Sequence, residues 1–94
     1  MITTYFNALR EKGITVNPED TIWIDLFARY VIKNKLMNRE KIQLVLDRTL
    51  EVIKPGQTSK DVVDLLKKFD IDYTPIDEKY LQRLNEYSEL FKQD

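Results

Sequence analysis

The chain contains no cysteine and no histidine. It therefore lacks disulfides, thiolate nucleophiles, imidazole groups for acid–base catalysis, and the Cys or His ligands of zinc and haem sites. The two serines, Ser59 and Ser88, belong to no nucleophile motif, and the isolated Gly13 and Gly56 form no glycine-rich phosphate loop. We expect a protein that is not an enzyme, with no catalytic residues, no cofactor and no metal.

One acidic segment has to be tested as a calcium loop. Asp70, Asp72 and Thr74 alternate in the way that the ligands of such a loop do. The pattern then fails, because Pro75 stands where the loop needs glycine and Leu81 stands where it needs a bidentate glutamate. Helix capping by Thr74 is the simpler explanation.

Long hydrophobic runs and an excess of charge of one sign are also lacking. No run approaches the roughly 18 apolar residues of a membrane-spanning helix, and no basic-then-apolar leader opens the chain, so we expect a cytoplasmic protein with no membrane partner. The 15 Lys and Arg residues against 16 Asp and Glu give a net charge of −1, which supplies no global attraction to DNA. Only two Gly and three Pro among 94 residues favour one ordered domain spanning residues 1–94.

Helix start and stop signals divide the chain into five segments. Apolar residues inside the segments recur at the i, i+3, i+4 spacing of amphipathic helices, and no alternation of period two persists. Gly13 is expected to end the first helix and Pro55-Gly56 to end the third. The expected starts are Thr3 or Thr4, Asn17 with Pro18, Asn38, Thr58 with Asp61, and Thr74 with Pro75 and Asp77.

Residues 5–33 and 62–90 follow the same pattern of a helix, a short extended link and a second helix. At a constant offset Pro18 matches Pro75 and Asp20 matches Asp77, and both residue types suit the first turn of a helix. The sequence therefore predicts an all-α, compact five-helix bundle of two similar helix-link-helix units joined by a central bridging helix. We expect the second, third and fifth helices to form most of the core.

Such units invite comparison with DNA-binding helix-turn-helix motifs, in which a glycine followed by an apolar residue often makes the turn, as Gly13-Ile14 would. The second helix of each unit, however, begins with carboxylates, Glu19-Asp20 in one and Asp77-Glu78 in the other. These would face the phosphates, so core packing explains the pattern better than DNA recognition does.

Basic residues gather in the stretch from the second to the third helix, where only Glu40 opposes them. They can serve solubility and the negative end of a helix dipole, or they can form a docking patch for an acidic protein surface or a nucleic-acid backbone. The candidate partner-binding residues here are Arg29, Lys33, Lys35, Arg39 and Lys41.

The last helix carries a second candidate surface. Ten aromatic residues are too many for so small a domain to bury, so part of the set is expected at the surface, either as an interface patch or as a half-exposed rim. The candidate residues are Tyr87, Leu90 and Phe91.

From the residues alone we expect a non-catalytic protein–protein interaction module: a small helical adaptor, inhibitor or assembly factor. Its partner would be another protein, including a second copy of the chain. The alternative is a helical nucleic-acid-binding regulator that uses the basic patch from Arg29 to Lys41, and the neutral overall charge makes this the less favoured partner.

Overall fold

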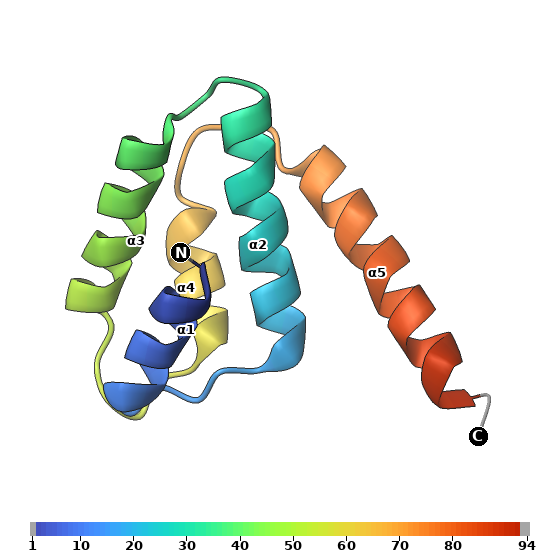
Figure 1. Cartoon of the computed structure of the whole chain (residues 1–94), viewed down its shortest axis with the longest axis horizontal. Helices are drawn as coiled ribbons and strands as arrows, with labels where there is room; N and C mark the ends of the chain where they lie inside the picture. Colours follow the sequence, from blue (N-terminus) through green and yellow to red (C-terminus); the bar gives the residue numbers. More distant parts are fainter. Residues whose placement is uncertain (1, 93–94) are drawn as a thin grey trace.

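The structure, a computed structural model, describes residues 2–92, except for the side chains of Tyr87 and of residues 89–92 (Figure 1). The prediction of an all-α fold with five helices is confirmed, and the described residues contain no strand. The helices are α1 (Ile2–Glu11), α2 (Pro18–Lys33), α3 (Arg39–Val52), α4 (Ser59–Leu66) and α5 (Thr74–Lys92).

The starts of α3 and α4 follow the local signals in the sequence. The Asn38 side chain accepts a backbone N–H from the first turn of α3 at 2.8 Å, and the Thr58 N–H donates to the Asp61 carboxylate at 3.0 Å at the start of α4.

The prediction that Thr3 or Thr4 caps the first helix is wrong, because both residues lie inside α1, and Asn17 precedes α2 as predicted but its side chain caps no backbone N–H of that helix. At the start of α5 the acceptor is Asp72, whose Oδ1 receives the Thr74 N–H at 3.0 Å. The backbone hydrogen bond from Thr74 lowers the pKa of the Asp72 carboxyl. Asp72 therefore caps α5, and Thr74, the residue predicted to be the cap, supplies the backbone N–H that is capped.

The link between α1 and α2 is held by backbone pairing that the sequence did not predict. Gly13 ends α1 with φ of +93°, a left-handed conformation that glycine adopts without strain. The Thr15 N–H then donates to the Gln57 carbonyl at 3.1 Å, and the Ser59 N–H donates to the Thr15 carbonyl at 2.8 Å. These bonds fix the first link against the loop that leads into α4.

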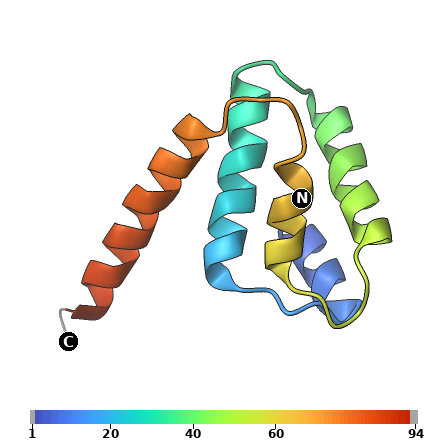
Figure 2. The same cartoon turned by 180° about the vertical axis from the view of Figure 1, so that it is seen from behind.

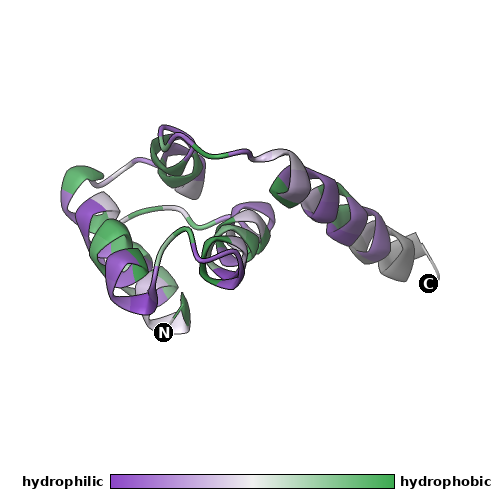
Figure 3. Ribbon diagram, turned by 90° about the horizontal axis from the view of Figure 1, so that it is seen from above, coloured by the Kyte–Doolittle hydropathy of each residue, from purple (hydrophilic) through white to green (hydrophobic). Residues whose placement is uncertain are grey.

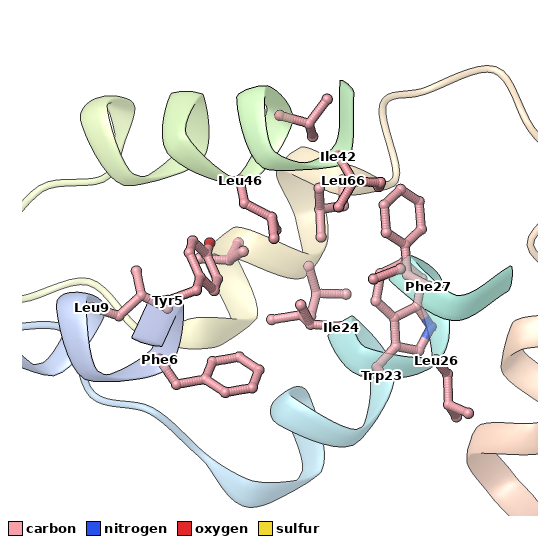
Figure 4. Packing of buried hydrophobic residues seen from close by; sticks show 14 of the residues in the cluster. Tyr5, Phe6, Leu9, Trp23, Ile24, Leu26, Phe27, Ile42, Leu46 and Leu66 are labelled. Carbon is pink, nitrogen blue, oxygen red and sulfur yellow. The ribbon is translucent and has the colours of Figure 1, made fainter. Parts of the chain in front are cut away.

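The hydrophobic core is formed by α1 to α4 (Figure 4). The expectation that α5 would be one of three main contributors is wrong, because Ile76 is its one fully buried apolar side chain among those described. The missing contribution comes from α1 and α4. The most buried apolar residues of the four helices include Tyr5, Phe6 and Leu9 of α1, Trp23, Ile24, Phe27 and Val31 of α2, Ile42 and Leu46 of α3, and Val62 and Leu66 of α4.

α2 is the spatial centre of the fold. α3 joins the two helix-link-helix units along the chain, yet it packs chiefly on α1, whereas α2 packs on both α4 and α5. α5 runs antiparallel to α2 and diverges from the bundle toward the C-terminus, as the opposite and top views also show (Figures 2 and 3). The divergence extends the molecule: its radius of gyration is 13.7 Å, against about 12 Å for a typical domain of this length.

The two aspartates that the sequence pattern pairs also make tertiary contacts. Asp20 Oδ2 accepts the Ser59 hydroxyl at 2.6 Å and so ties α2 to α4. Asp77 Oδ1 accepts the Trp23 Nε1–H at 2.9 Å and so ties α5 to α2. Each second helix of the repeated pattern is therefore anchored through the same position in its first turn.

Candidate interaction surfaces

The structure distributes the five basic candidate residues over three separate hollows. Arg29 and Lys33 lie between α2 and α5. Lys35 and Arg39 line a hollow of about 330 Å³ with Ile32 at the connection between α2 and α3. Lys41 lies on α3, at the edge of an apolar groove. The basic stretch is therefore continuous in sequence but is not one surface in space.

The hollow between α2 and α5, which we call the α2/α5 groove, has a volume of about 530 Å³. Arg29 and Lys33 stand one helical turn apart on one wall, and Lys79 and Arg83 stand one turn apart on the other. Glu78 is the one carboxylate among the residues that line it. Asp25, outside the groove, pairs with Arg29 at 3.0 Å. Four cations thus face one another across the two diverging helices.

A second groove lies between α3 and α4, and we call it the α3/α4 groove. It has a volume of about 290 Å³ and contains two of the large apolar side chains that are most exposed in the described part of the chain, Leu44 at 65% and Val52 at 47%. Such side chains cost free energy in water unless a partner covers them. Its lining residues are Lys41, Leu44, Val45, Arg48, Thr49, Val52, Leu65 and Phe69.

The rim of the α3/α4 groove is basic. Lys41 and Arg48 are the charged residues that line it, and no carboxylate lines it. Arg48 pairs with Glu51 at 3.1 Å, with both side chains more than two-thirds exposed, so the pair contributes little to stability and can exchange for another partner. The α3/α4 groove thus combines apolar side chains with a cationic rim.

The aromatic residues divide as the sequence led us to expect, with part of the set at the surface. The buried ones are Tyr5, Phe6, Trp23 and Phe27, and the partly exposed ones are Tyr30, Phe69, Tyr73 and Tyr80. Phe69 is the member of the second group that lines the α3/α4 groove. Tyr87, Leu90 and Phe91, the candidates on the last helix, lie outside the side chains that the structure describes.

Polar groups in the interior have structural partners. Thr49 donates its hydroxyl to the Leu46 carbonyl at 2.6 Å, which leaves the Tyr5 hydroxyl to donate to Thr49 Oγ1 at 2.6 Å. Burial raises the pKa of Tyr5 to about 12. Among the described side chains, no buried polar atom lacks a hydrogen-bond partner. These hydrogen bonds stabilise the fold.

The one serine–carboxylate pair in the described region is also structural. Ser59 is fully buried, and its hydroxyl oxygen accepts the Asn17 N–H at 2.9 Å while its hydroxyl donates to Asp20. No substrate can reach it. Over the described residues, no three carboxylates come together in a way that could hold a metal ion.

None of the helices in the described range is long and apolar enough to cross a membrane. Comparisons of the chain with protein-family models, with curated proteins and with solved structures find no match. Function must therefore be inferred from the surfaces themselves.

Sequence reasoning missed the apolar half of the α3/α4 groove. The helical spacing of the apolar residues in the fourth helix predicts that Leu65 and Phe69 are buried, but both are partly exposed and line the groove. The candidate residues named from the sequence do not include Leu44 and Val52. Leu44 offered a signal, because it lies on α3 off the stripe formed by Ile42, Val45, Leu46 and Thr49. Val52 offered none, because it follows Val45 by seven positions and so lies on the same face of the helix.

Proposed function

We propose that this protein is a non-catalytic interaction module that binds another protein through the α3/α4 groove. The observation that carries the proposal is the pair of exposed side chains, Leu44 and Val52, beside the partly exposed Leu65 and Phe69. Exposed apolar side chains are ordinary when scattered, but when they share a groove with cationic edges they are typical of binding sites.

The remaining exposed leucines differ from this arrangement. Leu81 on α5 is 60% exposed and Leu36 is 49% exposed, yet neither shares a groove with other strongly exposed apolar residues in the described part of the chain. They provide internal controls, because they match Leu44 in exposure and chemistry but not in surroundings.

Site-specific photocrosslinking in the cell of origin tests the proposal. A photoreactive phenylalanine derivative is placed at Leu44, at Leu81 and at the exposed Lys60. We expect discrete covalent adducts with a protein from position 44, and none of the same mass from the other two positions. Adducts of equal yield at all three positions, or none at 44, would contradict the proposal.

A second candidate function is nucleic-acid binding through the α2/α5 groove, favoured by the facing pairs Arg29 with Lys33 and Lys79 with Arg83. Four phosphate contacts predict a slope of log K against log salt of about −3 to −4 on duplex DNA. The slope should shrink in Arg29→Glu/Lys33→Glu but not in the charge-matched control Lys54→Glu/Lys60→Glu. Absence of binding at about 50 mM salt would remove this candidate.

A further inference from the structure

The α3/α4 groove has the dimensions of a helix-binding site. Its α3 wall runs from Lys41 to Val52, which at 1.5 Å per residue is about 16 Å, or three helical turns. Along this wall Leu44, Arg48 and Val52 succeed one another at intervals of four, so they form a single ridge. A ridge with this spacing is the surface into which the side chains of another α-helix interdigitate.

An extended peptide would find less to bind. Peptides that bind as strands need an exposed sheet edge, and residues 2–92 contain no strand that could supply one. A helix needs only a line of apolar contacts at i, i+3 or i+4, and i+7, and the groove provides these through Leu44, Val52 and Leu65.

The charges that line the groove indicate which kind of helix would bind there. The charged residues lining the groove, Lys41 and Arg48, are both cationic. Carboxylates lie outside the groove lining: Glu51 pairs with Arg48 at 3.1 Å, and Asp61 and Asp64 line the neighbouring hollow that shares Val52 and Leu65. A helix with acidic residues beside Lys41 and Arg48 is attracted, whereas a basic one is repelled, and complementarity of this kind sets specificity and association rate.

We propose that the α3/α4 groove binds an acidic amphipathic helix of a partner protein, about three turns long, with its apolar stripe on Leu44 and Val52 and its carboxylates beside Lys41 and Arg48. This inference rests on the proposed function and specifies the partner. A second copy of the chain fits less well. The longest helix that a copy offers, α5, lies on the side of the molecule opposite α3, so its insertion would join copies head to tail and not as a two-fold dimer (Figures 1 and 2).

Two synthetic helical peptides serve as probes. Both are stapled 14-residue sequences with leucine at positions i, i+4, i+7 and i+11, and they differ only in carrying glutamate or lysine on the polar flanks. Affinity is measured by fluorescence anisotropy, and the binding surface is mapped from amide chemical shifts of the isotope-labelled full chain. Sedimentation of the chain alone gives its mass over the same concentration range.

Two variants test the groove, each with a matched control. Leu44→Asp has its control in Leu81→Asp, an equally exposed leucine on α5. Lys41→Glu/Arg48→Glu has its control in Lys79→Glu/Arg83→Glu, which makes the same change in net charge. All four positions in the test and control charge variants are exposed, so we expect every variant to fold, and circular dichroism checks this.

We expect the acidic peptide to bind at least about tenfold more tightly than the basic one, with shifts centred on Leu44, Val52 and Leu65. Leu44→Asp should weaken it about tenfold, the double charge reversal should invert the preference between the peptides, and the controls should stay within about twofold. Equal affinity for both peptides, shifts centred on the α2/α5 groove, or no saturation at millimolar peptide would each overturn the proposal.

Mass that grows with concentration and is lost in Leu44→Asp would assign the groove to a second copy and also overturn it. The experiments distinguish failure of the proposed function from failure of the proposed partner chemistry. A crosslink from position 44 to another protein without binding of the acidic peptide would leave the proposed function standing and refute the partner chemistry alone.

Discussion

The hydrogen bond between Trp23 and Asp77 is the main polar tie between α5 and the rest of the fold. The indole is 3% exposed and stacks on Phe27 with ring centroids 5.6 Å apart, and its Nε1–H lies 2.9 Å from the carboxylate. A hydrogen bond to a charged group contributes about 1.5–3 kcal/mol. Trp23→Phe removes this bond and part of the buried contact area, which adds about 1 kcal/mol.

We therefore expect Trp23→Phe to lower the free energy of unfolding by about 3 kcal/mol, which in a domain of this size lowers Tm by about 12–24 °C. Asp77→Ala should also destabilise, through the lost bond and through the lost charge at the start of α5. A double-mutant cycle separates these effects, because only the shared bond makes the two changes non-additive. We expect a coupling of about 1.5 kcal/mol.

The assay is urea unfolding followed by circular dichroism at the helix band, since Trp23 is the one tryptophan and its removal abolishes intrinsic indole fluorescence. Hydrogen exchange adds a local readout: in Asp77→Ala the amides of α5 should exchange faster while those of α3 stay protected. A coupling below about 0.5 kcal/mol, or equal acceleration in both helices, would refute the view that this bond docks α5.

Three further predictions concern stability. Phe27→Ala should cost about 3–5 kcal/mol in chemical unfolding, because Phe27 is fully buried on the central helix, and a loss as small as that of the surface control Leu81→Ala would contradict this. The pKa of Tyr5 is about 12 in the folded state and has its ordinary value of 10.0 in the unfolded state, so the native state binds more protons between these two pH values. The protonated Tyr5 should contribute about 3 kcal/mol to the free energy of unfolding below pH 10, and this contribution should be lost as the pH rises to about 12. If the free energy of unfolding of Tyr5→Phe falls in parallel with that of the wild type over this range, the prediction is wrong. Asp72→Ala should lower Tm more than Thr74→Ala does, because Asp72 is the capping acceptor. Since the pKa of Asp72 is lowered in the folded state, its contribution to stability should be present above its ordinary pKa and fade as the pH falls below that value. A larger loss of Tm in Thr74→Ala would instead identify Thr74 as the cap.

Local features of this fold could be predicted from the sequence because a few neighbouring residues decide them. The Asn38 cap, the Thr58–Asp61 capping box and the left-handed Gly13 all satisfy backbone groups within one turn of themselves. Even here the sequence could not distinguish between two possible capping residues, Asp72 and Thr74, which are two positions apart. The geometry of the preceding link makes Asp72 the acceptor.

The placement of helices relative to one another could not be predicted in this way. An apolar stripe says that a helix packs, but it does not say against which partner or over what length. The stripe of α5 looks as regular as that of α2, yet α5 leaves the bundle while α1, only ten residues long, buries Tyr5, Phe6 and Leu9. The basic stretch shows the same limit, because the end of α2 and the turn at Lys35, with φ of +57°, send its members to different hollows.

The α3/α4 groove stays uncovered because α2, and not α3, is the helix against which α4 and α5 pack. Because α2 lies at the centre and packs on both α4 and α5, the outer face of α3 receives no second layer of helix, and Leu44 and Val52 remain uncovered there. Burying them within this chain would require α5 to fold back over α3, but the Trp23–Asp77 bond holds α5 on the other side of α2. The contact that docks α5 therefore also keeps α5 away from the α3/α4 groove. Weakening that contact in Asp77→Ala should let α5 compete for the groove, so the affinity for the acidic peptide should fall, whereas unchanged affinity would show that α5 does not reach Leu44 and Val52.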